Sequence, residues 1–255
     1  MHGGGCQHRP VSTELEVHPA ERDDPRLAAL ELVGGAAEQG VTLRATGGIA
    51  VAILCPSASE APLKRSYKDL DLVGPSRQRD AIDELMKRLG YAANEEFNSL
   101  HGSHQLLYAD SRGRVLDVFI DRIVMCHALD VSGRLELCDH TLSAEDLLLT
   151  KLQVIQATDS DLRDAVALLA DCVLDDGRIA DVLASDWGWW RTATETLGKV
   201  RDYNAALEGF GGRTRVAGAI SALETAIERA PKGMRWRMRA RVGDRVPWYL
   251  TPEEE

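Results

Sequence analysis

The chain has 255 residues, of which 44% are hydrophobic and 27% are charged, and its formal net charge is −10. These values are typical of a globular protein with a proper core, and the acidic surplus argues against a protein that binds nucleic acid over its whole surface. No run of about eighteen apolar residues occurs, so the sequence predicts no membrane span.

The stretch 1–22 is polar and lacks the apolar segment of a signal peptide, so we expect a flexible tail there. The five cysteines show no C-x-x-C spacing, which predicts a cytoplasmic protein with reduced thiols and no disulfide framework. Cys126-His127 and Cys138-x-His140 allow two interpretations, a zinc set or buried thiols beside ordinary histidines. Their close spacing favours the second.

Hydrophobic periodicity and turn residues divide the chain into two halves of different character. The elements expected up to residue 140 are a helix over 25–39, a strand over 41–45, a Gly47-Gly48 turn, a helix over 49–54, a loop over 57–68, a strand over 69–73, a helix over 76–89 capped by Ser76, a hairpin of strands 105–108 and 114–120, and an edge strand over 135–137. After it we expect helices over 143–156, 161–174, 189–207 and 216–229.

This layout predicts an α+β fold, in which a small mixed β-sheet is flanked by helices and followed by an all-helical carboxyl-terminal region. We expect three parts: the tail over 1–22, an α/β domain over 23–142 and a helical domain over 143–255.

Two carboxylates share one face of the strand predicted over 69–73. Successive side chains of a strand point to opposite faces, so Asp69 and Asp71 lie on one side while Leu70 and Leu72 anchor the other. Carboxylates held about 6 to 7 Å apart repel each other. A hard, oxygen-seeking cation such as Mg²⁺, bound together with substrate phosphates, relieves that repulsion.

A later strand carries a third candidate. Asp117 and Asp121 lie on the same side of the strand that runs through Leu116-Asp117-Val118-Phe119-Ile120-Asp121. They are about 13 Å apart, so both cannot serve one metal pair. We favour Asp117, which apolar residues flank, and expect Asp121 to pair with Arg122.

Gly47-Gly48 follows a predicted strand and precedes a predicted helix. Glycine lets the backbone approach a ligand closely, and a helix amino terminus offers free N–H groups to a phosphate. The pair therefore supplies backbone donors to a site whose carboxylates would hold metal.

The order Gly47-Gly48, Asp69-Leu70-Asp71-Leu72 and Leu116-Asp117-Val118-Phe119 resembles the nucleotidyltransferase superfamily with the DNA polymerase β-like fold. The signature of that superfamily is a glycine turn, then D-h-[DE]-h, then a third carboxylate on a later strand. The continuation from Asp146 to Asp164 is similar to the AbiEii-type branch of minimal nucleotidyltransferases. The likeness covers about residues 40–175, with a spacer over 49–68 that is longer than the family pattern.

The resemblance implies an enzyme that uses Mg²⁺ or Mn²⁺ to transfer NMP from an NTP to a hydroxyl acceptor and releases pyrophosphate. On this resemblance the acceptor would be a small molecule, a protein or tRNA, and the enzyme would be of a toxin type or a resistance type. A toxin-type enzyme would have an antitoxin-like protein as its partner. Asp69 and Asp71 would hold two metal ions, and Asp117 would share one and orient or deprotonate the attacking hydroxyl. Gly47 and Gly48 would bind the triphosphate.

Two lysines are further candidates for nucleotide binding. Lys68 lies in the loop with Lys64 and Arg65, where these charges attract an anion or form a solvated face. Lys151 lies within the family-like helical motif, where it neutralises phosphate charge or extends along the helix surface to solvent.

Two features of the last eighty residues leave other functions open. The basic segment 232–245 either contacts RNA or balances an acidic body. The tryptophan-rich stretch 186–191 either stacks on a base or an acceptor or forms a helix-packing plug, and we favour the plug. The alternative to an enzyme is a catalytically degenerate member of the same fold that acts as a binding or regulatory partner.

Overall fold

The computed structural model describes residues 23–250, so the tail predicted over 1–22 lies outside the described residues. The chain forms two compact units. The first, here called the α/β unit, contains the described residues of Met1–Ile53 together with Ser66–Ile123 and Asp130–Ser143. The second, the helical unit, contains Leu54–Arg65, Val124–Leu129 and the described residues of Ala144–Glu255.

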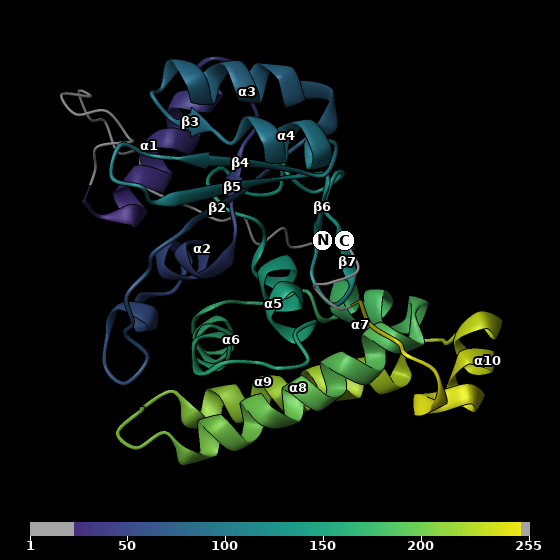
Figure 1. Ribbon diagram of the computed structural model, residues 1–255. Helices are drawn as coiled ribbons and strands as arrows, with labels where there is room; N and C mark the ends of the chain where they lie inside the picture. Colours follow the sequence, from purple (N-terminus) through teal and green to yellow (C-terminus); the bar gives the residue numbers. More distant parts are fainter. Residues whose placement is uncertain (1–22, 251–255) are drawn as a thin grey trace. The chain divides into compact units, whose positions relative to one another are not determined.

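A five-stranded mixed sheet forms the centre of the α/β unit (Figure 1). In spatial order the strands are β1 (Arg44–Ala45), β2 (Leu70–Gly74), β5 (Val115–Ile120), β4 (Gln105–Ala109) and β3 (Ala92–Ala93). β2 and β5 run parallel, while the other neighbouring pairs are antiparallel. The α+β class and the mixed sheet expected from the sequence are confirmed.

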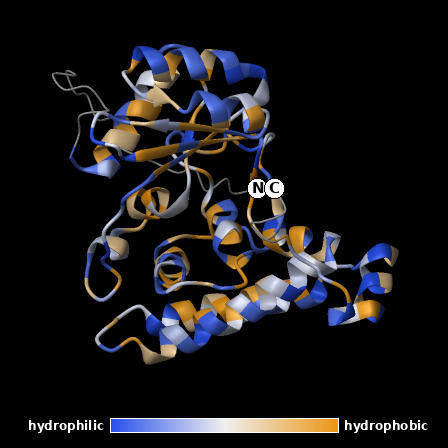
Figure 2. Ribbon diagram, viewed as in Figure 1, coloured by the Kyte–Doolittle hydropathy of each residue, from blue (hydrophilic) through white to orange (hydrophobic). Residues whose placement is uncertain are grey.

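The two faces of the sheet differ in chemistry because side chains alternate along each strand. One face of the three long strands is apolar and buried, made by Leu70, Leu72, Leu106, Tyr108, Leu116, Val118 and Ile120. In Figure 2 the strands carry both hydrophobic and hydrophilic colouring along their length. The other face is half-buried and includes Asp71, Gln105 and Asp117.

Helices α1 (Pro25–Glu38), α3 (Arg79–Arg88) and α4 (Glu95–His101) lie on one side of this sheet (Figure 1). α3 buries Ile82, Leu85 and Met86, and the hydroxyl of Tyr108 on the buried face donates to Asp83 of α3 at 2.8 Å. α4 is fixed to β4 by two hydrogen bonds between the side chain of Asn98 and the backbone of Leu107. These contacts leave the acidic face on the opposite side of the sheet.

The helical unit consists mainly of α5 (Ala144–Leu152), α6 (Asp159–Asp171), α7 (Asp176–Ser185), α8 (Trp187–Ala206), α9 (Arg213–Arg229) and α10 (Met234–Val242). Local sequence sets several helix starts. Thr158 and Asp161 form a capping box for α6, and the carboxylates of Asp175 and Asp186 cap α7 and α8. Hydrophilic and hydrophobic residues alternate along α8 and α9 (Figure 2). This is expected of helices that bury one side in the core and expose the other.

Several predicted elements differ from the structure. The edge strand over 135–137 is wrong, because the backbone there forms turns, with Arg134 N–H bonded to Val131 and Leu137 N–H to Arg134. The short strands β6 (Arg122–Val124) and β7 (Ala128–Asp130) were not predicted. The strand expected over 41–45 is reduced to β1, and the helix expected over 143–156 ends at Leu152.

The cap predicted at Ser76 is also wrong. Residues Ser76–Gln78 form a 3₁₀ turn before α3, without a capping bond from the serine side chain. The backbone N–H of Ser76 instead donates to the carboxylate of Asp121 at 2.9 Å. The carboxylate of Asp121, which is distant in the sequence, therefore satisfies the backbone N–H of Ser76 at this turn.

Candidate active site

The half-buried face of the sheet brings together the aspartates singled out from the sequence. Asp71 of β2 and Asp117 of β5 are direct partners in the parallel register of the two strands. Register partners on neighbouring strands project to the same side of a sheet. Two acidic side chains that are 46 positions apart in the sequence thus lie side by side on one face.

Asp69 lies at the entrance to β2, one residue before the strand begins, and its side chain is exposed. The strand expected over 69–73 therefore starts one residue later than predicted. The charge of Asp69 nevertheless reaches Asp117. Burial raises the pKa of Asp117 above its ordinary value, and the negative charge of Asp69 raises it further.

Gln105 is a site residue that the sequence did not reveal. Its amide Nε2 donates to Asp117 Oδ1 at 2.6 Å, and this hydrogen bond opposes the rise in the pKa of Asp117. Gln105 pairs with Phe119 across the β4–β5 hairpin, so it reaches Asp117 diagonally on the same face. A single glutamine at the start of a strand gives no sequence signal for this contact.

The Gly47-Gly48 pair forms the first turn of α2 (Gly47–Leu54), directly after β1. Gly47 has φ +62°, and a Cβ atom added there would lie 2.0 Å from Asp71 Oδ2. The backbone N–H of Thr46 donates to the carbonyl of Asp71 at 2.8 Å. Glycine is thus required at position 47 both by its backbone angle and by the carboxylate packed against it.

The polar groups of this face fit a hard cation that bridges to phosphate. The donors are carboxylate oxygens that repel one another, and they stand beside a helix amino terminus whose N–H groups suit an anion. Thr46 Oγ1, next to the glycine pair, is buried and has no hydrogen-bond partner within residues 23–250. A buried hydroxyl of this kind calls for a polar partner.

Across residues 23–250, no group of three or more His, Cys, Asp or Glu side chains is arranged to hold a metal ion by itself. Gln105 engages Asp117 by a hydrogen bond, and Asp69 lies outside the strand. Mg²⁺ is commonly bound by one or two carboxylates together with water and substrate phosphates, not by a complete protein cage.

Asp121 has a structural role distinct from these aspartates. It has φ +61°, and its carboxylate accepts the N–H of Ser76. Its own backbone N–H donates to the carbonyl of Gly74 at 3.0 Å. The pairing with Arg122 expected from the sequence is replaced by these turn contacts.

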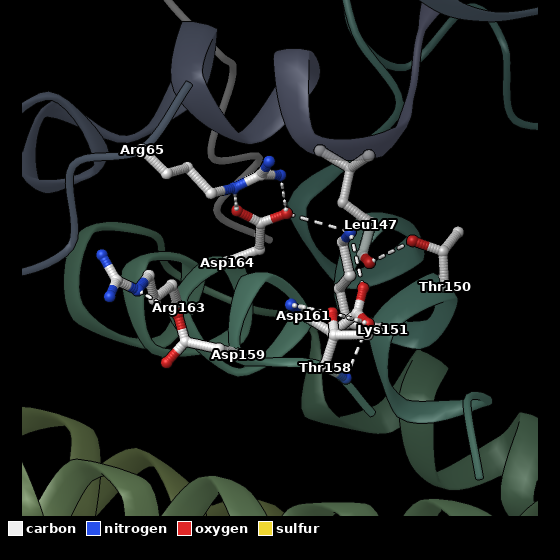
Figure 3. A network of polar contacts seen from close by, with 9 residues as sticks. All are labelled: Arg65, Leu147, Thr150, Lys151, Thr158, Asp159, Asp161, Arg163 and Asp164. Atoms are coloured by element: carbon white, nitrogen blue, oxygen red, sulfur yellow. Dashed lines mark hydrogen bonds and ion pairs between the residues drawn. The ribbon is translucent and has the colours of Figure 1, made fainter. Parts of the chain in front are cut away.

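The two candidate lysines have different surroundings. Lys68 is exposed and directly precedes Asp69. Lys151 belongs to the helical unit, where its ammonium group lies 2.9 Å from Asp164 Oδ2 and 3.2 Å from Asp161 Oδ1 (Figure 3). Asp164 also binds the guanidinium of Arg65 through two contacts of 2.9 and 2.7 Å. The role of either lysine in nucleotide binding stays a prediction.

The tryptophan-rich stretch packs within the helical unit. Trp187 and Trp189 are buried, Trp190 lies edge-on to Trp236 at 5.3 Å, and Trp187 lies edge-on to Trp248 at 6.2 Å. This agrees with a packing plug. The basic segment 232–245 contains α10, none of whose residues is buried, and its contact with RNA stays a prediction.

The helices described between residues 23 and 250 include none with the length and hydropathy of a membrane span. No protein-family model and no curated protein matches the chain. Solved structures with a similar arrangement include two of the antibiotic-resistance factor ANT(2'')-Ia, one in solution and one in a crystal with adenylyl-2''-tobramycin. A third is an antigenic nucleotidyltransferase-like protein from Paracoccidioides brasiliensis.

The solution structure of ANT(2'')-Ia shares 14% identity over 73% of this chain and 97% of its own, with a TM-score of 0.39. The crystal structure with adenylyl-2''-tobramycin shares 13% identity over 79% of this chain and 97% of its own, with a TM-score of 0.34. The protein from Paracoccidioides brasiliensis shares 15% identity over 78% of this chain and 93% of its own, with a TM-score of 0.41. Likeness at this level carries no functional argument, so the function is argued from the residues of the acidic face.

Proposed function

We propose that the chain is a nucleotidyltransferase that moves NMP from an NTP to a hydroxyl acceptor and releases pyrophosphate. The observation that carries this proposal is the register of Asp71 with Asp117 on neighbouring parallel strands, with the Gly47 turn packed against Asp71. An acidic pair beside a helix amino terminus supports the proposal, because carboxylates can bind a metal ion and free N–H groups can bind phosphate.

Asp69, Asp71 and Asp117 are the residues that would hold Mg²⁺ or Mn²⁺. When bound, such ions neutralise charge on the entering and leaving oxygens of an in-line displacement at phosphorus. The backbone N–H groups that begin at Gly47 and Gly48 bind the triphosphate. Asp117, whose pKa is raised, is suited to accept the proton of the acceptor hydroxyl, and Gln105 fixes its orientation.

The test uses NTP labelled on the α-phosphate, with Mg²⁺ or Mn²⁺ and a panel of hydroxyl acceptors that includes aminoglycosides, tRNA and the protein itself. We expect the α label to be transferred and pyrophosphate to be released, while a γ label is not transferred. Asp71→Asn and Asp117→Asn should each reduce transfer by on the order of 100-fold or more.

The matched control is Asp121→Asn. It removes a carboxylate charge four positions from Asp117 but keeps an oxygen that can accept the Ser76 N–H, and asparagine tolerates the positive φ at this position. Transfer by this variant should equal that of the parent. If all three variants label acceptors as well as the parent, the proposed function is wrong.

A second candidate is a degenerate member of the same fold that binds or regulates a partner. The observation that favours it is that no complete group of metal-binding side chains is arranged within residues 23–250. Such a protein would show no metal-dependent binding of NTP. Binding of a metal–nucleotide to the parent, lost in Asp71→Asn, would exclude it.

A further inference from the structure

Two cysteines that are 117 positions apart in the sequence meet in the helical unit, where their Sγ atoms lie 3.7 Å from each other. Cys55 precedes a 3₁₀ helix (Pro56–Ser59), and Cys172 is the residue that follows α6. Both are free thiols. Both stand at the ends of elements, where a side chain can turn without breaking a helix.

Neighbouring bonds hold these two segments together independently of the sulfur contact. The backbone N–H of Ser57 donates to the carboxylate of Asp171 at 2.8 Å. At the other end of the segment 54–65, Arg65 forms its two contacts with Asp164 of α6. Because polar anchors flank the thiols, the closeness of the two sulfur atoms is built into the fold.

The two thiols are not equivalent. Cys55 is completely buried, whereas Cys172 is half-buried. The hydrogen bond between them lowers the pKa of Cys172, while the same bond and burial raise the pKa of Cys55. Since the thiolate is the nucleophile in exchange, Cys172 is the attacking sulfur and Cys55 the resolving one.

We propose that Cys55 and Cys172 form a thiol–disulfide exchange site, which a small disulfide such as oxidised glutathione converts to an intramolecular disulfide. The Cys172 thiolate attacks the small disulfide, forms a mixed disulfide and expels one glutathione thiolate. Cys55 then gives up its proton and attacks Cys172 Sγ, and the second glutathione leaves as a thiolate. The protein loses two protons and two electrons, and the small disulfide becomes two thiols.

Little movement is needed for this bond. A disulfide has an S–S length of about 2 Å, so the two sulfur atoms must approach by somewhat less than 2 Å from their contact distance. Oxidation would join the segment 54–65 to the end of α6 covalently. The proposal is independent of the nucleotidyltransferase activity.

The experiment treats the folded full-length protein with oxidised glutathione, blocks remaining thiols and maps the linked peptides by mass spectrometry. We expect one cross-linked peptide pair, containing Cys55 and Cys172, and a higher Tm that returns to the reduced value after treatment with dithiothreitol. Any pair that involves Cys6, Cys126 or Cys138 in place of these two would overturn the proposal.

Two variants separate the roles of the thiols. Cys55→Ser should trap glutathione on Cys172 as a stable mixed disulfide, whereas Cys172→Ser should abolish the cross-link and leave Cys55 unmodified. Cys126→Ser is the control and should form the Cys55–Cys172 link at the parental rate. Absence of any glutathione adduct on Cys172 in the Cys55→Ser protein would contradict the assignment of the attacking sulfur. Even if a buried serine impairs the folding of a variant, the peptide map of the parent still shows whether the Cys55–Cys172 disulfide forms.

Discussion

The position of the Asp71 side chain depends on Gly47, which packs against it. No side chain larger than hydrogen fits at Gly47, because a Cβ there would lie 2.0 Å from Asp71 Oδ2. Gly47→Ala must therefore displace the carboxylate in addition to straining a backbone angle of φ +62°. We expect NMP transfer to fall by on the order of 100-fold, as for a site group that loses its geometry, measured by the α-label assay.

Gly40→Ala is the matched control for this prediction. Gly40 has a similar φ of +73°, but nothing lies within 4 Å of the Cβ that would be added. It should lose about 1 kcal/mol of stability through backbone strain while retaining parental transfer. Equal activity of the two alanine variants would show that Asp71 need not occupy its observed position.

Gln105 orients Asp117 through one hydrogen bond of 2.6 Å. Gln105→Leu keeps most of the side-chain volume and removes the donor, so Asp117 can rotate. Loss of a residue that orients a metal ligand typically weakens metal affinity about 10-fold or more. We therefore expect the Mn²⁺ concentration for half-maximal transfer to rise by about that factor. If the Mn²⁺ titration of Gln105→Leu superimposes on the parental curve, Gln105 does not orient Asp117 for metal binding.

The candidate aspartates could be found from the sequence because alternation along a strand fixes which side chains share a face. Asp69, Asp71 and Asp117 were predicted in this way, and the register of β2 with β5 brings the last two together. Gln105 could not be found, since its contact crosses a hairpin diagonally and depends on register. Asp121 was assigned the wrong partner because the turn that carries Ser76 lies 45 positions away.

At the scale of elements, a buried charge cluster ties α6 to α5 and to the segment 54–65. Asp164 is 2% exposed and contacts both Arg65 and Lys151 (Figure 3). Asp164→Asn removes the buried carboxylate charge that Arg65 and Lys151 share, although Lys151 keeps its contact with Asp161. Breaking a buried pair in this way costs about 3 to 5 kcal/mol. We expect a loss of that order in the free energy of unfolding measured with urea.

Asp159→Asn provides the comparison for Asp164→Asn. Asp159 also pairs with an arginine, Arg163 on the next turn of α6, but its side chain is 61% exposed. Exposed pairs of this kind contribute about 1 kcal/mol or less. If the two asparagine variants lose the same stability, the Asp164 cluster does not anchor α6.

Helices with long apolar periodicity were predicted better than short elements, and α4 and α7 were missed although Asn94 and Asp175 cap them. The helix over 25–39 was predicted from apolar residues at helical spacing, whereas its cap, the Asp24 side chain that accepts the N–H of Arg26, was found only in the structure. The β6–β7 pair was missed and a strand was wrongly placed over 135–137, because segments of three residues carry too little periodicity to identify a strand. Such short pairings depend on tertiary contacts that the local sequence does not encode.

At the scale of the whole molecule, His127 links stability to pH. It is buried, its Nε2 lies 2.9 Å from Thr192 Oγ1, and its ring stacks on Trp189. Burial lowers its pKa from 6.5 to about 4. Between these values the unfolded chain binds a proton that the folded chain does not, so stability falls as the pH drops through this window.

The predicted contribution of His127 is a loss of on the order of 3 kcal/mol between pH 7 and pH 4, because each pKa unit corresponds to about 1.4 kcal/mol. His127→Gln removes the titrating group. Urea unfolding as a function of pH should therefore show a shallower decline for this variant than for the parent. Parallel curves would mean that His127 becomes protonated equally in the folded and unfolded states.

The acidic face of the sheet is proposed to bind a metal–nucleotide. Calorimetric titration of the parent with a non-hydrolysable NTP should show binding in the presence of Mn²⁺ and none in the presence of a chelator. Asp71→Asn should abolish the metal-dependent heat, and Asp121→Asn should retain it. Binding that is unchanged by chelation or by Asp71→Asn would contradict the claim.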